Sequence, residues 1–422
     1  MFLKLKEEIK EGKTLLQFGF LKSAGRALGM LVPLVVAKFF SEELFGSYTL
    51  ARMIPFFFMA FSIESFKVPF IVYGNEERMK SGKINKSLSV QCIFILFSMG
   101  LFLSMVLAIP GPIMSLTKIT KVELFFIVLA FTGLVIKAFL SNLCMAMGQR
   151  IKDSRIDFVF GLLTISFVLI FYFAGVLNLS MVFFVYFIAG VLVLSIFIKS
   201  FDFKLFLPLV FDKQYFKDMF NFAKWMVFGS AAGHFINWVD LLVLRFYGIS
   251  MGEIGGYGLG YQIFKGFMVL MSILPLYFLP FITEHINNPE KVRSYLYNKR
   301  PKIFILGLIP IILIFAAIPY IFNFIYQDSY QEAVTVIRIL LVAVVLVLYN
   351  LFYYPIINAL KKYRAYSIIS IIHVLINVIL NIILIPIYGL YGAAVATVIG
   401  YFFRVVMIEF YYRYKLRGIL KI

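Results

Sequence analysis

The sequence has few charged residues for its length. Asp, Glu, Lys and Arg make up 14% of its 422 residues, whereas hydrophobic residues make up 62%. A soluble domain carries roughly 25% charged and 45–50% apolar residues, so the composition excludes a chain of water-exposed domains. The mean hydropathy is +0.95, and apolar blocks of about 20 residues or more are typical of helices that cross a bilayer. The composition therefore predicts an all-α integral membrane protein rather than a β-barrel.

Residues that carry cofactor chemistry are also scarce. The only cysteines, Cys92 and Cys144, both lie in apolar blocks, so we expect neither a disulfide nor a metal site. The three histidines have no HExxH or Cys/His ligand spacing. The glycine-rich stretch 252–260 lacks the GK[ST] of a phosphate-binding loop, and no such motif occurs elsewhere. We therefore expect no cofactor, no ATP hydrolysis and no binding of nucleic acid.

Hydropathy predicts twelve membrane-spanning helices. They cover residues 16–39, 44–73, 87–109, 122–147, 156–177, 179–198, 219–247, 251–283, 302–326, 332–359, 364–387 and 389–412. Pro55, Pro69, Pro275 and Pro280 lie inside long spans and are candidate kinks, because proline removes a backbone hydrogen-bond donor. Residues 1–14 mix lysine with glutamate, so we expect an amphipathic lead-in at the membrane surface and a retained first span.

The basic residues of the connections indicate the orientation. Both termini and five alternate connections hold 27 Lys and Arg, whereas the opposite connections hold only Lys118 and Lys121. Because cytoplasmic loops carry the excess of basic residues, this division places both termini in the cytoplasm of a cell whose inner membrane the chain crosses. A missed span would destroy the alternation, so the pattern also supports the span count.

The spans divide into two halves of equal number. We expect an N-terminal lobe (1–198, spans 1–6), a cytoplasmic interfacial linker (199–218) and a C-terminal lobe (219–422, spans 7–12). The segments 43–50 and 253–259 open corresponding spans with similar sequences. Since each half has an even number of spans, this match predicts a parallel repeat about a pseudo-two-fold axis along the membrane normal. The mixed aromatic and basic residues of the linker favour an interfacial helix.

Several basic residues remain deep inside the predicted spans. They are Arg26, Arg52, Lys137, Lys265 and Arg404. Each costs at least about 2.5–3.5 kcal/mol at the bilayer centre, so each should face a cavity or a partner. Acids well inside the spans are fewer: Glu64, Asp240 and Glu409, while Asp157 falls at a span end within reach of water. Salt bridges inside the helix bundle, such as that of Glu64 with Lys67, cannot neutralise all the cations. The surplus predicts a water-filled cavity for an anionic ligand.

Three side chains are candidates for coupling transport to an ion gradient. They are Glu64, His234 and Asp240. His234, Asn237 and Asp240 follow a helical spacing in span 7, although Asp240 pairing with Arg245 is an equally good interpretation. In span 11, Asn377 and Asn381 lie one turn apart, and we expect them to make hydrogen bonds between helices.

The C-terminal part of the chain carries a family resemblance. Residues 377–397, NVILNIILIPIYGLYGAAVAT, resemble the signature of Wzx-type polysaccharide (O-antigen repeat-unit) flippases. These flippases belong to the multidrug/oligosaccharidyl-lipid/polysaccharide (MOP) exporter superfamily. The turn 45–48 after span 1, and residues 246–248 with 256–257 after span 7, are also similar to that family.

The resemblance implies a MATE-like fold, with two six-helix lobes around a central cavity. It also implies a flippase, not an enzyme, that moves undecaprenyl-diphosphate-linked oligosaccharides to the outer leaflet for surface polysaccharide biosynthesis. The expected partners are that lipid-linked oligosaccharide, membrane lipids and other polysaccharide-assembly membrane proteins. In related lipid II flippases, cations of spans 1, 2 and 8 line the cavity, which points to Arg26, Arg52 and Lys265 here.

Two other classes of function remain open. A lipid II or small-molecule exporter of the same superfamily is one, although lipid II flippases usually carry two further spans and a cavity for cationic drugs should contain acids. A membrane-embedded polymerase or glycosyltransferase is the other. Such enzymes commonly need a large outer loop, whereas the outer connections of this chain are short. Because no ATP site is present, an ion gradient is the expected driving force.

Overall fold

The computed structural model of the chain describes residues 2–236, 238–360 and 362–420. Within these ranges the regular structure is helical, and the chain divides into two compact units. Unit 1 comprises Met1–Phe39 and Leu50–His234, and unit 2 comprises Phe40–Thr49 and Phe235–Ile422. The prediction of an all-helical protein is confirmed. The lobes predicted at 1–198 and 219–422 stay a prediction.

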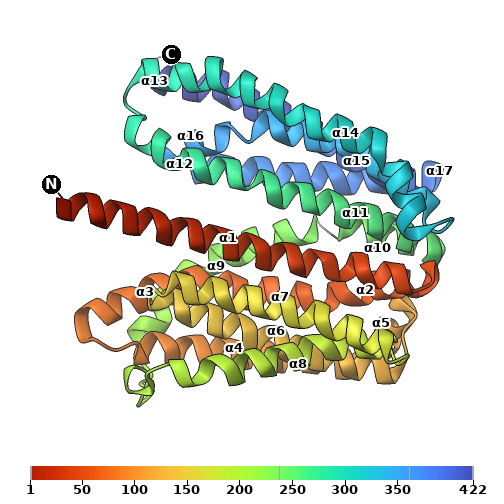
Figure 1. The fold of residues 1–422 in the computed structure, drawn as a ribbon, viewed down its shortest axis with the longest axis horizontal. Coiled ribbons are helices and arrows are strands. Elements are labelled where there is room, and N and C mark those ends of the chain that lie inside the picture. Colours follow the sequence, from red (N-terminus) through yellow and green to blue (C-terminus); the bar gives the residue numbers. More distant parts are fainter. Residues whose placement is uncertain (1, 237, 361, 421–422) are drawn as a thin grey trace. The chain divides into compact units, whose positions relative to one another are not determined.

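Unit 1 holds the helices α1 to α9, apart from the first part of α2, and Figure 1 labels them along the chain. These are α1 (Phe2–Phe39), most of α2 (Glu42–Met59), α3 (Ser65–Ser81), α4 (Asn85–Ala108), α5 (Pro110–Thr117), α6 (Lys121–Ala146), α7 (Arg150–Phe173), α8 (Leu179–Phe197) and α9 (Lys213–Phe235). A capping box begins α6, where Thr120 and Glu123 satisfy each other's backbone N–H groups. Asn178 begins α8 by accepting a hydrogen bond from the Met181 N–H.

Unit 2 holds the rest of the chain. Its helices are α10 (Val239–Phe246), α11 (Met251–Met271), α12 (Ile273–His285), α13 (Pro289–Ser294), α14 (Arg300–Tyr326), α15 (Gln331–Asn350), α16 (Tyr353–Ala359), α17 (Tyr363–Tyr411) and α18 (Arg417–Leu420). A second capping box, between Ser250 and Glu253, begins α11. The backbone of α17 leaves the helical conformation at Gly389, with φ 56° and ψ −135°. Gly389 is the first residue of the last predicted span.

Eight helices in the described ranges are long and apolar enough to cross a membrane by length and composition. They are Gln17–Phe39, Asn85–Ala108, Lys121–Ala146, Arg150–Phe173, Leu179–Ser200, Pro289–Tyr326, Gln331–Asn350 and Arg364–Leu420. The last contains two predicted spans, joined across Gly389. The chain is therefore a multi-pass membrane protein, while the count of twelve spans stays a prediction. The predicted spans 44–73, 219–247 and 251–283 fall on interrupted helices.

Prolines account for some of these interruptions, but not at the positions expected. Pro55 lies inside an uninterrupted α2, whereas Pro69 lies in α3, and the helix widens upstream of Pro69 into the π-helical turn η1 (Ala60–Glu64). The break between α11 and α12 falls at Ser272, three residues before Pro275. Proline disfavours the helical conformation of the residue before it and clashes with the carbonyl four residues back, so the helix yields upstream of the ring.

The linker (199–218) is helical from Lys213, where α9 begins, and its place at the membrane interface stays a prediction. It contains two short 3₁₀ turns, η2 (Ile198–Ser200) and η3 (Phe203–Leu205), before α9 begins. Pro208 has no N–H, and the linker backbone pairs instead with the start of α4: the Ile84 N–H donates to Leu205 O over 2.9 Å. The Lys86 ammonium lies 2.7 Å from Asp212, and this hydrogen bond lowers the pKa of the Asp212 carboxyl.

Glycines allow the closest helix contacts within each unit. In unit 1, a Cβ on Gly25 of α1 would lie 2.7 Å from the backbone of Asp157 in α7. In unit 2, a Cβ on Gly46 would lie 1.9 Å from the carbonyl oxygen of Met251. These distances are far below van der Waals contact, so only glycine permits the approach. The contact at Gly25 determines which side chains of α1 and α7 meet.

Candidate substrate and ion sites

A pocket of about 440 Å³ lies among the helices of unit 1. Five basic side chains and two carboxylates line it: Lys22, Arg26, Arg52, Lys67, Lys137, Glu64 and Asp157. They come from α1, α2, η1, α3, α6 and α7. The pocket thus brings together Arg26, Arg52 and Lys137, three of the five cations singled out in the sequence.

One carboxylate in this pocket, that of Asp157, pairs with two lysines. Lys22 Nζ lies 2.5 Å from Asp157 and 2.7 Å from Asp153, and Lys137 forms an ion pair with Asp157. Ser141 donates a further hydrogen bond to Asp153. The two aspartate side chains are only 1% and 9% exposed. Two lysines and two aspartates form a network without net charge, so Lys137 is not the free cation that its position in the sequence indicated.

The placement of Asp157 corrects the sequence analysis. The sequence predicted that Asp157 lies at a span end within reach of water, and this prediction is wrong. Because α7 begins at Arg150 rather than at 156, position 157 lies about two turns into the helix. The packing of Gly25 against its backbone then brings Lys22 onto the carboxylate. Lys22 and Asp153 also belong to this site. Their ion pair in the structure identifies them as members, whereas their spacing in the sequence does not.

The two arginines of the pocket lie in different surroundings. The Arg26 side chain is exposed, and it makes no hydrogen bond or ion pair with any residue in the described ranges. The Arg52 guanidinium stacks on Phe56, with its carbon 4.9 Å from the ring centroid. A guanidinium is planar and presents paired donors in one plane, which suits bidentate recognition of an oxyanion.

Two of the candidate coupling groups also line this pocket. Glu64 lies 3.6 Å from Lys67, the pairing that the sequence spacing predicts, and its side chain is half exposed. His234 contributes to the wall, with its ring 6.5 Å from that of Phe57. The π-helical turn that ends at Glu64 is what carries this carboxylate to the pocket.

The third candidate, Asp240, is the centre of a buried polar cluster in unit 2. Tyr257 and Thr397 donate hydrogen bonds to Oδ2 over 2.5 and 2.9 Å, and Asn381 donates to Oδ1 over 2.6 Å. Asn377 accepts a hydrogen bond from Asn381 over 3.1 Å. All these side chains are less than 5% exposed. The expectation of hydrogen bonds between helices for Asn377 and Asn381 is confirmed for Asn381, which joins α17 to α10.

The helical spacing of His234 and Asp240 does not place them on one continuous helix. Their spacing is meaningful only in a continuous helix, but α9 ends at Phe235 and α10 begins at Val239. Asn237, the middle residue of that pattern, lies outside the described residues. The alternative interpretation was an ion pair between Asp240 and Arg245, and the described ranges show no such pair. The stretch 377–397, which carries the family resemblance, supplies three of the side chains around Asp240.

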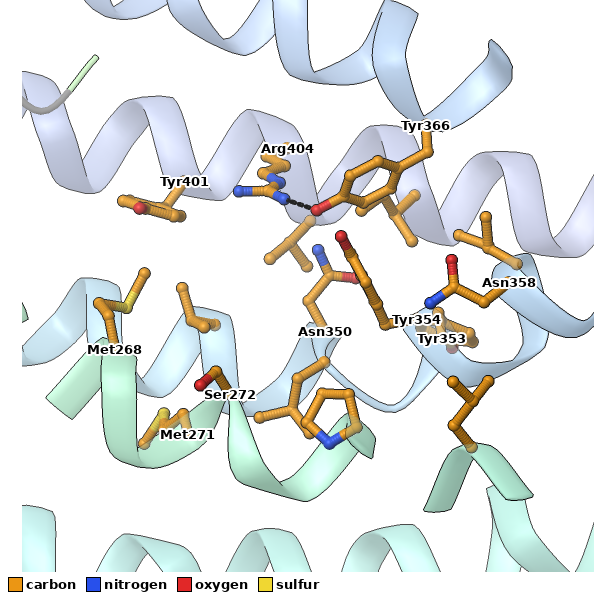
Figure 2. Close-up of a pocket in the computed structure, with 17 residues that line it drawn as sticks. Met268, Met271, Ser272, Asn350, Tyr353, Tyr354, Asn358, Tyr366, Tyr401 and Arg404 are labelled. Atoms are coloured by element: carbon orange, nitrogen blue, oxygen red, sulfur yellow. Dashed lines mark hydrogen bonds between the residues drawn. The ribbon is translucent and has the colours of Figure 1, made fainter. Parts of the chain in front are cut away.

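The last two cations lie in unit 2, apart from each other. Lys265 Nζ is 4.1 Å from the Trp238 ring and 4.8 Å from the Tyr261 ring. Arg404 lines a separate pocket of about 350 Å³ (Figure 2). Convergence of Lys265 with Arg26 and Arg52 on one cavity stays a prediction.

Comparison with known proteins finds likeness in structure. No protein-family model matches the sequence, and no curated protein does. The lipid II flippase MurJ in an inward closed conformation aligns with a TM-score of 0.73 at 17% identity, over 94% of this chain and 87% of that chain. An inward-facing multidrug resistance MATE family transporter of the MOP superfamily aligns with a TM-score of 0.74 at 15% identity, over 93% of this chain and 95% of that chain.

A third solved structure extends the comparison to a ligand complex. The MATE multidrug transporter DinF-BH, solved with a bound ligand, aligns with a TM-score of 0.66 at 18% identity, over 97% of both chains. Identities this low establish the fold alone. These neighbours are transporters and not enzymes. The chain has the fold of the MOP-superfamily transporters.

Proposed function

We propose that this protein is a flippase that moves undecaprenyl-diphosphate-linked oligosaccharides from the cytoplasmic to the outer leaflet for surface polysaccharide biosynthesis. The observation that carries the proposal is the charge of the unit 1 pocket. Five basic and two acidic side chains line it, and the buried Asp153 behind it adds one more acid. The pocket therefore keeps a net positive charge inside a membrane protein, where an unbalanced cation is costly unless an anion binds.

Arg26 and Arg52 are the side chains that we assign to the diphosphate. A diphosphate offers several acceptor oxygens, and arginine binds such groups through paired N–H donors. Lys137 and Lys22 act indirectly, because they are paired with Asp157 and fix the wall of the pocket. Lys265, whose ammonium lies 4.1 Å from the Trp238 ring and 4.8 Å from the Tyr261 ring, stays a candidate for substrate binding from the sequence alone.

Asp240 is the proposed coupling group for an ion gradient. Its cluster is rich in oxygen ligands, and Asn381 Oδ1 is buried without a hydrogen-bond partner in the described ranges. A carboxylate surrounded by amide and hydroxyl oxygens suits a proton or a small hard cation. Binding of that ion would change the charge of a buried site, and transport follows if the ion binds two conformations unequally.

The proposal includes the twelve-span topology with both termini in the cytoplasm and two six-helix lobes. The strong basic bias of alternate connections supports it. A drug exporter of the same fold is the second candidate, because two of the similar structures are multidrug transporters. The excess of cations in the unit 1 pocket speaks against a cationic drug as substrate. A polymerase or glycosyltransferase is disfavoured because the similar proteins are transporters.

Reconstitution tests the proposal directly. Purified protein is placed in proteoliposomes that contain an undecaprenyl-diphosphate oligosaccharide, and sugar exposed at the far leaflet is oxidised by an impermeant reagent. We expect protein-dependent exposure, its loss in Arg52→Ala, and its retention in Lys224→Ala, which changes an exposed cation outside the pocket. Transport of a cationic dye without any flipping of the lipid would favour the drug exporter instead.

A further inference from the structure

Two helices of unit 2 are interrupted where they line the Arg404 pocket. The α11–α12 break lies at Ser272, and α15 ends at Asn350 before α16 begins at Tyr353. Ser272, Asn350 and Leu351 all line the cavity (Figure 2). In a membrane protein, broken helices are tolerated where the freed backbone groups border a cavity, and such breaks commonly mark binding sites.

Arg404 is the cation of this pocket, and its partners are neutral. One terminal nitrogen, Nη2, donates to the Tyr366 hydroxyl, and the other points toward Tyr401 (Figure 2). Its Nε is buried without a hydrogen-bond partner in the described ranges. No carboxylate there lies within ion-pair distance of Arg404. Glu409 of the same helix is occupied by Tyr353 at 2.5 Å and by Arg413 at 2.9 Å.

The rest of the lining is mostly aliphatic, and its polar part combines tyrosine rings with two amides and Ser272. Tyr354, Tyr366 and Tyr401 surround the guanidinium, and Tyr354 is 37% exposed. The electron-rich face of an aromatic ring attracts the polarised C–H bonds of a sugar ring. Asn350 and Asn358 line the same cavity, and Asn350 Oδ1 is buried with no partner in the described part of the chain. Amides of this kind donate to and accept from sugar hydroxyls.

We propose that this pocket binds an acidic pyranose, a sugar ring that bears a carboxylate. Arg404 holds the carboxylate, the tyrosines pack on the ring, and the two asparagines bind its hydroxyls. A volume of about 350 Å³ is at the lower end of the range for small-molecule sites, so it suits a head-group sugar better than a polyprenyl chain. The proposal rests on the proposed function, since it assigns an acidic sugar to the oligosaccharide that is transported.

Saturation-transfer NMR on the full-length protein in lipid nanodiscs tests the site. The probes are methyl glucuronide, methyl glucoside and inorganic phosphate. We expect the glucuronide to bind and the glucoside to bind at least about tenfold more weakly, because a hydrogen bond to a charged group is lost. Arg404→Gln should weaken glucuronide binding by a similar factor. Arg338→Gln is the matched control, because Arg338 lies outside the pocket and bonds to Phe315 O.

A second variant tests the proposal even if Arg404→Gln fails to fold. Ser272 is exposed at the helix break, so Ser272→Asp adds a negative charge to the pocket and leaves Arg404 in place. It should weaken the glucuronide, but not the glucoside. Equal binding of both sugars, or glucuronide binding unchanged in Arg404→Gln and Ser272→Asp, would overturn the proposal. Displacement of the glucuronide by phosphate at equal concentration would make this a phosphate site and also overturn it.

The flipping assay separates this proposal from the one on which it rests. If lipid-linked oligosaccharides are flipped while glucuronide binding does not depend on Arg404, the pocket assignment alone fails. If glucuronide binds through Arg404 while no lipid-linked oligosaccharide is flipped, the acidic-sugar site stands and the flippase proposal fails.

Discussion

The Tyr257 hydroxyl donates a 2.5 Å hydrogen bond to the buried carboxylate of Asp240. The donor belongs to α11 and the acceptor to α10, and α17 completes the cluster with Asn381 and Thr397. Three helices of unit 2 are thus tied to one acid. A change in the charge of Asp240 would change its hydrogen bonds to α11 and α17, so an ion that binds there would alter the packing of all three helices.

The first prediction concerns the role of this acid in coupling. Asp240→Asn keeps the size of the side chain but removes its charge, so gradient-driven flipping in proteoliposomes should fall at least about tenfold. Flux is measured with an imposed pH gradient and, separately, with an imposed sodium gradient. Asp328→Asn, which changes an exposed acid in a connection predicted to be outer, should have no effect. If Asp240→Asn keeps both the flux and its dependence on the gradient, Asp240 is structural.

The second prediction concerns the guanidinium of Arg52. It lies over the Phe56 ring and offers paired donors in one plane, whereas lysine provides no such plane. Arg52→Lys should therefore be as severe as Arg52→Ala, and each should abolish surface polysaccharide in cells with unchanged protein levels. Cell-surface staining and immunoblotting measure the two quantities. Full activity of Arg52→Lys would mean that only the charge matters.

The third prediction concerns the carboxylate shared by two lysines. Asp157→Asn leaves Lys22 and Lys137 short of a countercharge, and loss of one partner in a buried pair costs about 3–5 kcal/mol. The unfolding temperature in detergent should fall sharply, and adding Lys137→Met should restore part of it. Glu64→Gln breaks only an exposed pair and should cost less than about 1 kcal/mol. An unchanged unfolding temperature in Asp157→Asn would contradict the assigned network.

The fourth prediction separates two glycines one helical turn apart in α1. A Cβ on Gly25 would lie 2.7 Å from the Asp157 backbone, whereas nothing lies within 4 Å of a Cβ on Gly29. Gly25→Ala should destabilise the protein by about 1–3 kcal/mol through overpacking. Gly29→Ala should be neutral or slightly stabilising, because alanine favours the helix. Thermal unfolding of the purified variants measures both, and equal effects would refute the packing described for α1 on α7.

The fifth prediction concerns the topology. In a background with Cys92 and Cys144 replaced by alanine, single cysteines report which side of the membrane each connection faces. An impermeant thiol reagent applied outside should label cysteines at Ser41, Asn178 and Ser329, and should not label those at Ser81, Ser294 and Lys362. The reversed labelling pattern would contradict the predicted orientation, and a mixed pattern would contradict the count of twelve spans.

Much of the fold follows from hydropathy and local signals. Helix α8 illustrates this, because an apolar block follows Asn178, a residue that caps helices, and Gly175 adopts a positive φ of 71° after α7. The tight turn at Gly389 is similarly visible in the sequence. Such features depend on a few neighbouring residues, which a sequence displays directly.

The site was less predictable, because it depends on contacts between distant residues. Arg26, Arg52 and Lys137 were found as deep cations, but Lys22 was not, since its partners Asp153 and Asp157 lie on a helix far along the chain. The helix break between His234 and Asp240 invalidated an argument from periodicity. The π-helical turn before Ser65 has no sequence signal beyond Pro69, which lies four residues after that serine.

The neutral network of Lys22, Lys137, Asp153 and Asp157 has a consequence for how this sequence can change over evolutionary time. Its charges come from three helices but balance only as a set. A substitution at any one of the four positions is therefore tolerated best when a second position changes with it. Related sequences should vary at these positions in charge-matched pairs, whereas Arg26 and Arg52, outside the network, should vary independently of them.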